Sequence, residues 1–378
     1  MMKGFIDMDS PTAVESLKGP LPLHVGVATN ADTLTPLRMA WRSLADRSDL
    51  PTTQHEWTLA AMGLLRSDLR PMVMYVSDNS GIRAILPLMP KIEYGVEHFQ
   101  FLSPSASLPM EVLHADSTSL EMVLRHVLKL GRPLVLNRLL EGSPTVEFFK
   151  VLGDQHKART MIESAEPVQR LGVANFPQQD RAGNAARVSI LAASFGLSGG
   201  PNDVIFQYAS PSIDQVMSLY HESLQLEGYN PSLQSRKSTR EIDGFEFLRA
   251  HAFHGAQRGE LRFACLRLAG RLLAVQMFQL RRQTAWLLKA THLDRFRGTT
   301  LDTLLMGETM RKLQQEDIAQ IIMPSGAAGP ELSNCEAVPL VNLRCYPWCM
   351  RSLAVLSLAR VCNTTNRLLH RTGNKPRG

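Results

Sequence analysis

The chain has 378 residues, of which 44% are hydrophobic and 20% charged, and a formal net charge of +6 at pH 7. This length suits two domains rather than one core, and the hydrophobic fraction excludes a disordered or fibrous chain. No apolar run reaches the roughly 18 residues that cross a bilayer, and the start lacks the pattern of a secretory signal. We therefore expect a cytoplasmic protein.

The first half of the chain alternates strand and helix patterns. Its predicted elements are, in chain order, a strand at 21–30, helices at 33–48 and 55–69, a hairpin at 71–94, short strands at 98–104 and 111–116, a helix at 119–130 and a strand at 133–140. Residues 166–184 carry few apolar side chains, and we interpret them as a linker, or a strand and loop, between domains.

The second half repeats this order of elements. It begins with a helix at 186–199 ending at Gly199-Gly200, a strand at 203–209, a helix at 212–228 with Ser212 as its cap, and a helix at 241–259. Three strands at 260–270, 271–282 and 284–293, a helix at 299–317 and a strand at 318–324 follow. Each half thus reads helix, hairpin, helix, strand, without evident sequence identity between the two.

The five cysteines form an odd and scattered set, which is unlike a disulfide framework. Cys345 and Cys349 are four residues apart, but no second pair of ligands follows them, so we expect no metal site. Cys265 has no histidine partner in an identifiable motif, and we interpret it as a packing residue. The positive charge is spread along the chain except at its end, so no nucleic-acid partner is expected.

One segment combines features that favour binding of a phosphate. An apolar strand ends at Leu293, a short basic loop containing Arg295, Arg297 and Gly298 follows, and a helix begins near Thr299. Free N–H groups at a helix start favour an anion, and glycine lets a phosphate approach the backbone. The alternative is an ordinary strand-to-helix turn with a solvated basic flank.

Residues 295–300 resemble the Arg/Gln-x-x-Gly-x-Gly/Ala loop by which GNAT acyltransferases bind the pyrophosphate of acyl-coenzyme A. The wider chain is similar to the acetyltransferase family associated with cellulose and other exopolysaccharide synthesis, often called CelD/BcsL. Three further stretches carry this similarity: residues 41–44 and 54–57 with 85–88, residues 222–232, and residues 270–274 with 289–292. Thr300 stands where the loop usually has Gly or Ala. A second register, Thr300-Leu301-Asp302, would place an acid at the phosphate, so we prefer the first.

The resemblance implies an α/β fold of two tandem GNAT-like domains, with mixed twisted sheets flanked by helices. We assign residues 1–170 to the first domain, 171–345 to a second domain with the acyl-CoA site, and 346–378 to a basic amphipathic tail. The co-substrate would be acetyl-CoA or a longer acyl-CoA. The backbone amides of Thr299 and Thr300 would bind its pyrophosphate.

Four side chains are candidates for the chemistry of acyl transfer, each with a plainer alternative. Glu222 matches a family position and would act as base or orient a water, or it is a solvated helix residue. His292 would accept a proton beside the loop, or is a partly buried histidine. Tyr229 would donate to the leaving thiolate, although packing is its alternative. Lys289 lies on a buried strand, where a lysine needs a charged partner or water; it would line the substrate groove, or it faces water or pairs with a carboxylate.

The expected activity is N-acyl transfer from acyl-CoA to an amine of a cell-envelope or exopolysaccharide precursor, an amino sugar or a lipid amine. One alternative is an inactive GNAT-fold regulatory protein of an exopolysaccharide system that binds a nucleotide through Arg281 and Arg282. A third is an aminoacyl-tRNA-dependent transferase, which would need a long helical arm that the sequence lacks. The acid-free end of the chain, residues 344–378, would lie on an anionic membrane surface or pack on the protein. The predicted location is cytoplasmic, peripheral to the inner membrane.

Overall fold

The computed structural model describes residues 22–65, 69–93, 96–104, 108–155, 157–175, 181–226, 244–293, 301–325 and 335–348. The strands of the first half are β1 (His24–Ala28), β2 (Met72–Asp78), β3 (Gly81–Glu93), β4 (Val96–Phe101), β5 (Leu113–His114) and β6 (Leu134–Leu140). Its helices are α1 (Ala31–Leu34), α2 (Arg38–Ala45), α3 (His55–Gly63), α4 (Ser117–Lys129) and α5 (Pro144–Asp154), with 3-10 turns at Thr35–Leu37 and Pro51–Thr53.

The second half has the helices α6 (Arg181–Ser194), α7 (Ile213–Leu226), α9 (Gly244–Gln257) and α10 (Leu301–Gln315). Its strands are β8 (Val204–Ala209), β9 (Leu261–Leu268), β10 (Arg271–Arg281), β11 (Thr284–His292) and β12 (Gln320–Pro324). Two long strands belong to both halves, β7 (Ala158–Gly172) and β13 (Glu336–Pro347). Short 3-10 turns lie at Val173–Asn175 and Pro201–Asp203.

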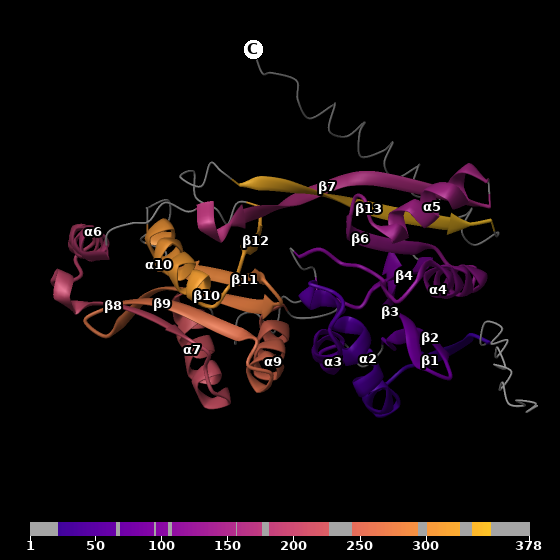
Figure 1. Ribbon diagram of the computed structural model, residues 1–378, viewed down its shortest axis with the longest axis horizontal. Helices are drawn as coiled ribbons and strands as arrows, with labels where there is room; N and C mark the ends of the chain where they lie inside the picture. Colours follow the sequence, from indigo (N-terminus) through magenta and orange to yellow (C-terminus); the bar gives the residue numbers. More distant parts are fainter. Residues whose placement is uncertain are drawn as a thin grey trace, which may run out of the picture.

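All these strands form one mixed sheet in the order β1-β2-β3-β4-β6-β13-β7-β12-β11-β10-β9-β8, with β5 paired to β3. The halves join because β7 pairs with β13 along one part of its length and with β12 along another. Figure 1 shows β7 and β13 running along the top of the molecule, above both halves. The last described strand of the chain therefore lies between two strands of its first half.

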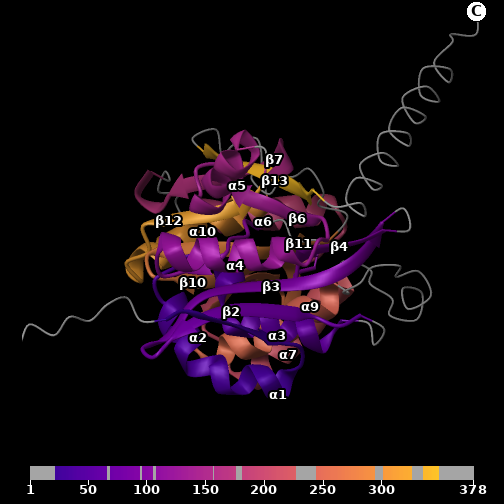
Figure 2. The same cartoon turned by 90° about the vertical axis from the view of Figure 1, so that its right-hand side faces the viewer.

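Helices cover both faces of this sheet. In the first half, α4 and α5 pack on one face through Val123, Val127 and Phe149, while α2 and α3 pack on the other through Trp41 and Trp57 (Figure 2). In the second half, α7 and α9 share a core with α2 and α3, and α6 and α10 cover the opposite face. This layered arrangement confirms the predicted α/β fold of two similar halves.

The elements expected from the sequence are present, with three differences. The helix expected at 186–199 ends at Ser194, where Gly196 takes a positive φ of 73°. Helix α5 and strand β13 were not expected, and β7 begins well before the predicted linker at 166–184. None of the helices in the described part of the chain is long and apolar enough to cross a membrane.

Candidate functional site

The sheet opens between two neighbouring parallel strands of the second half. Strands β11 and β12 pair at Thr284↔Gln320, Ala285↔Ile321 and Trp286↔Ile322. Strand β11 continues to His292, but in the described ranges its later residues pair only with β10 on the other side. Among the described residues no strand pairs with β11 on this side beyond Trp286, so the two strands separate here and leave an edge at which a ligand could enter.

A β-bulge lies at the start of this opening. Phe278 pairs with Leu287 and Met277 pairs with Lys289, so Leu288 is an extra residue in β11. Bulges bend a strand and redirect its side chains, and they are common beside active sites. The bulge therefore changes the direction of β11 just after its last pairing with β12.

Helix α10 follows β11 and leads into β12, so it begins at the same end of the sheet as the opening. Its buried side chains, among them Leu301, Leu304 and Leu305, pack on the sheet face that α6 also covers. The helix starts at Leu301, so the alternative loop register would place two of its three residues inside the helix. Arg295, Arg297, Gly298, Thr299 and Thr300 lie outside the described residues.

Lys289 lies on the opposite face of β11, under helix α7. Its Nζ is 5.3 Å from the centroid of the Tyr220 ring, a cation–π contact. Tyr220 is fully buried, and Thr291 shares the face of β11 that carries Lys289. The cation–π contact with Tyr220 offsets part of the cost of covering the lysine, which lies on β11 next to the opening.

Glu222 lies farther along the same face, above β9. Both of its carboxylate oxygens accept hydrogen bonds from the Arg267 guanidinium, at 2.7 and 3.1 Å. Strand β10 separates β9 from β11, so the two strands are about 10 Å apart. The structure thus presents Glu222 as a carboxylate paired with an arginine of β9, whereas Lys289 lies two strands away on β11.

His292 lies on the other face of the sheet. It pairs with Ala274, which belongs to the core beneath α6 and α10, whereas Glu222 lies on the α7 face. The two predicted proton acceptors are therefore not brought together. Tyr229 lies outside the described residues.

The first half has a related pair of parallel strands, but its own chain fills the space beside them. Strands β4 and β6 pair only at Phe99↔Leu134 and Gln100↔Val135. Beyond these pairs, Met110 forms a parallel bridge with Leu139. At the start of α4, the Asp116 carboxylate accepts a 2.8 Å hydrogen bond from the backbone N–H of Ser119. In the first half the chain's own residues thus occupy the space beside the parallel strands and the start of the following helix.

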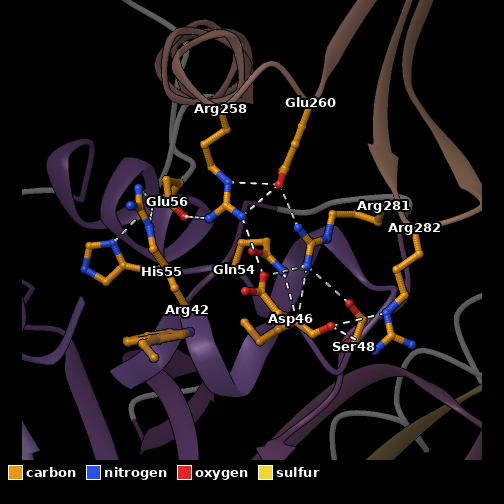
Figure 3. Close-up of polar contacts among 12 residues, drawn as sticks. Arg42, Asp46, Ser48, Gln54, His55, Glu56, Arg258, Glu260, Arg281 and Arg282 are labelled. Atoms are coloured by element: carbon orange, nitrogen blue, oxygen red, sulfur yellow. Dashed lines mark hydrogen bonds and ion pairs between the residues drawn. The ribbon is translucent and has the colours of Figure 1, made fainter. Parts of the chain in front are cut away.

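Arg281 and Arg282, the candidate nucleotide ligands, contact the first half instead. Arg281 is buried; it donates to the backbone carbonyl of Ala45 at 3.3 Å, and to Glu260 of its own half at 2.8 Å. Arg282 donates to the backbone carbonyl of Asp46 at 2.9 and 3.2 Å (Figure 3). Because these contacts are within the protein, the pair does not form an open anion site.

The cysteines that the structure describes are free thiols, and two of them lie in the core. Burial raises the pKa of Cys265 to about 12 and that of Cys345 to about 12, so neither is a thiolate near neutral pH. Among the described residues, no group of three His, Cys, Asp or Glu side chains is placed to hold a metal ion.

Two features of the site were missed in the sequence. The bulge at Leu288 has no signal in the sequence, because the surrounding apolar run reads as an ordinary strand. The partnership of Glu222 with Arg267 joins residues far apart in the chain, and only their shared sheet face brings them together.

Comparison with known proteins agrees with this geometry. Residues 203–328 match the family model described as an acetyltransferase (GNAT) domain. The second half carries an acetyltransferase-type GNAT domain. The match covers the opening between β11 and β12 and helix α10. No curated protein matches the chain by sequence.

Solved structures share the fold over most of the chain. FemX superposes with a TM-score of 0.52 at 7% identity, covering 85% of this chain and 98% of that one. The C-terminal domain of a putative lysylphosphatidylglycerol synthetase from Agrobacterium fabrum has a TM-score of 0.50 at 11% identity, covering 86% and 95%. A protein of unknown function from Bacteroides thetaiotaomicron has a TM-score of 0.50 at 9% identity, covering 85% and 100%. These likenesses extend over both halves of the chain, and with the match of residues 203–328 to a GNAT domain they agree with a fold of two tandem GNAT-like halves.

Proposed function

We propose that the protein is an N-acyltransferase that transfers the acyl group of acyl-CoA directly to an amine. The observation that carries this proposal is the opening between β11 and β12, which begins at a bulge and faces the start of α10. The match of residues 203–328 to a GNAT domain supports the same reading. The donor is acetyl-CoA or a longer acyl-CoA.

The reaction needs no covalent intermediate on the protein. The neutral amine attacks the thioester carbonyl, a C–N bond forms, the C–S bond breaks, and the amine proton passes to a base. We propose Glu222 or His292 as the group that accepts this proton, directly or through a water, and Tyr229 as the donor to the leaving thiolate. Lys289 would line the acceptor side of the opening.

The pyrophosphate of the coenzyme would bind at the loop before α10. In this proposal Gly298 leaves space for the phosphate, Arg295 and Arg297 supply positive charge, and the amides of Thr299 and Thr300 donate hydrogen bonds. Helix α10 begins at Leu301, so its dipole would add to the attraction.

The test is binding of acetyl-CoA and longer acyl-CoA molecules, measured by calorimetry and by thermal unfolding. At 100 times the dissociation constant, the ligand should stabilise the fold by about 2.7 kcal/mol. Gly298→Val should abolish binding while the fold survives, and Arg295→Ala should weaken it about ten- to a hundredfold. Thr300→Gly should be neutral or improve binding. Arg311→Ala, which removes an exposed partner of Glu308 on α10, is the matched control.

Unchanged affinity in both Gly298→Val and Arg295→Ala would remove the coenzyme from this loop. The second candidate is a GNAT-fold regulatory protein without catalysis. It would be favoured if the protein binds acyl-CoA but releases no free coenzyme A with any of the acceptors. One observation favours that candidate: the two predicted proton acceptors lie on opposite faces of the sheet.

For the acceptor, we propose an amine of the cell envelope, either an amino sugar of an exopolysaccharide precursor or a lipid amine. The shared fold with the domain of a lysylphosphatidylglycerol synthetase supports a lipid-linked version. Release of coenzyme A should be compared with glucosamine derivatives and long-chain amines as acceptors. If none of these amines releases coenzyme A faster than hydrolysis of the acyl-CoA does in their absence, the result would count against this acceptor class.

The acid-free end of the chain supports a location at the inner face of the membrane, because a run of arginines attracts anionic lipids. The protein should sediment with vesicles containing phosphatidylglycerol at low salt and be released by high salt. A form truncated after Met350 should stay in solution. Equal behaviour of both forms would show that this end does not bind membranes.

A further inference from the structure

The turn between β10 and β11 is held by the first half of the protein. Arg281, the last residue of β10, donates hydrogen bonds to the carbonyl of Ala45 at 3.3 Å and to the carbonyl of Ser48 at 3.5 Å. Arg282 takes a positive φ of 49° and donates to the carbonyl of Asp46. Both guanidinium groups therefore bind the carbonyl end of α2, where free C=O groups and the helix dipole favour cations.

A network of charges surrounds this contact (Figure 3). Glu260 accepts from Arg281 and from Arg258 at 2.8 Å each, and Arg258 reaches Glu56 of the first half at 3.5 Å. The Arg281 side chain is 6% exposed, so these bonds are little weakened by water or salt. We call the contacts of Arg281 and Arg282 with residues 45–48 the α2 clamp.

The same turn holds the start of β12. The carbonyl of Gln283 accepts hydrogen bonds from the backbone N–H groups of Ala319, at 2.8 Å, and Gln320, at 3.2 Å. The side-chain amide of Gln320, through its Nε2, also donates to Thr284 Oγ1 at 2.9 Å. The β11–β12 pairing begins at this point and ends two residues later, at Trp286. The clamp thus fixes the base from which the two strands separate.

We propose that Arg281 is a positioning residue for the acyl-CoA opening. By holding the β10–β11 turn on α2, it sets the direction of β11 relative to β12, so the first half shapes a site that lies in the second. This inference rests on the proposed function, but its structural part, the coupling of the clamp to the β11–β12 base, does not.

The experiment compares Arg281→Met with a matched control, Arg262→Met. Arg262 is a similarly covered arginine of the second half, 15% exposed and paired with Glu316, and it does not contact α2. Two measurements are made on the full chain below its unfolding temperature: the affinity for acetyl-CoA, and amide hydrogen exchange without ligand. Arg281→Lys keeps the positive charge but loses the planar guanidinium with its several fixed donors, and it serves as the conservative variant.

We expect Arg281→Met to weaken acetyl-CoA binding at least tenfold. It should also speed amide hydrogen exchange in residues 284–292 and 320–324, while the exchange rates in β1 and β2 stay unchanged. Arg281→Lys should lie between it and the parent, and Arg262→Met should bind within twofold of the parent. Equal losses in Arg281→Met and Arg262→Met would show a general stability effect and overturn the proposal. So would unchanged affinity and exchange in Arg281→Met.

Two further results distinguish a failure of the proposed function from a failure of the proposal for Arg281. If the unmodified protein does not bind acyl-CoA at all, the proposed function fails, and the exchange rates alone decide the clamp. If Arg281→Met does not fold, Arg282→Met replaces it, because Arg282 is 54% exposed and its loss removes only the outer part of the clamp. Unchanged exchange at 284–292 in Arg282→Met would then overturn the proposal.

Discussion

His251 shows how one buried side chain links the stability of the halves to pH. It is 1% exposed, lies against Trp57 of α3, and its Nε2 is 2.7 Å from Gln279 Oε1. Burial lowers the pKa of His251 to about 4, while the unfolded chain titrates near 6.5. The unfolded state therefore binds more protons between these values, and stability falls as the pH drops through this window.

We predict that the free energy of unfolding falls by about 2–3 kcal/mol between pH 7 and 4.5 on account of this residue. His251→Met should remove that part of the pH dependence, although it also loses the bond to Gln279. Urea unfolding at several pH values measures the slope. The control is His24→Met, on the edge strand β1, which should keep the full slope. An unchanged slope in His251→Met would contradict the prediction.

The placement of Glu222 and His292 gives a second prediction at this scale. They lie on opposite faces of the sheet, so only one of them can reach the attacking amine. We expect one of Glu222→Gln and His292→Gln to lower kcat about a hundredfold, and the other to change it little. Single-turnover release of coenzyme A measures both. A hundredfold loss in each variant would mean that the two act together, against the placement.

At the scale of elements, the start of α4 in the first half has an acidic cap, Asp116. Asp116 accepts from Ser119 and forms a 2.6 Å ion pair with Arg83. Burial raises its pKa, but these hydrogen bonds and the arginine outweigh burial and leave the pKa below its ordinary value. The N-terminus of α4 is thus occupied by a carboxylate of the chain itself.

Asp116→Ala should destabilise the protein by about 0.5–2 kcal/mol, because an amide of the first turn loses its partner. Asp116→Asn should keep most of the cap and lose the ion pair. Chemical denaturation measures both. The number of acetyl-CoA molecules bound per chain should stay at one in each variant; a second molecule would show that the first half also has a coenzyme site.

Most elements were predicted because their signals are local. Period-two and helical patterns identify β2, β3, α4 and β9 to β11. Ser212 caps α7 as expected, because its Oγ accepts a 3.4 Å hydrogen bond from the backbone N–H of Gln215. Helix α5 was missed although Ser143 and Pro144 form a start signal, with Ser143 accepting from Val146. Strand β13 was missed because Pro339 lies inside it and Pro347 ends it, and prolines are uncommon within strands.

The site was less predictable than the fold. The opening depends on where β11 and β12 stop pairing, and the α2 clamp depends on contacts between residues more than 200 positions apart. A single sequence carries no information on such distant partners. The doubling of the element order was visible, but the strands that join the halves were not.

At the scale of the whole molecule, the halves share strands. Strand β7 continues through residue 171, where we place the boundary between the domains. Strand β13 pairs with both β6 and β7. Helices α3 and α9 add a second contact, with the Trp57 and Phe247 rings 4.6 Å apart. One cooperative unit is therefore the expected behaviour of the described chain.

We predict that a chain ending at residue 334 loses ordered structure in the first half, although every residue of β1 to β6 is present. Without β13, strand β6 loses one neighbour, and β7 loses its partner over residues 158–170. A chain ending at Trp348 is the control and should unfold as the full chain does. Circular dichroism and hydrogen exchange measure the difference. A protected first half in the shorter chain would contradict the prediction.

The position of β13 also has a consequence during synthesis on the ribosome. Strand β7 ends at Gly172 and β13 ends at Pro347, so the N-terminal half waits for a strand that is made much later than its own residues. At 5–20 residues per second, this wait lasts roughly 10 to 35 s. Throughout it the nascent chain exposes the unpaired edges of β6 and β7, which are the surfaces that chaperones or stray strands would bind.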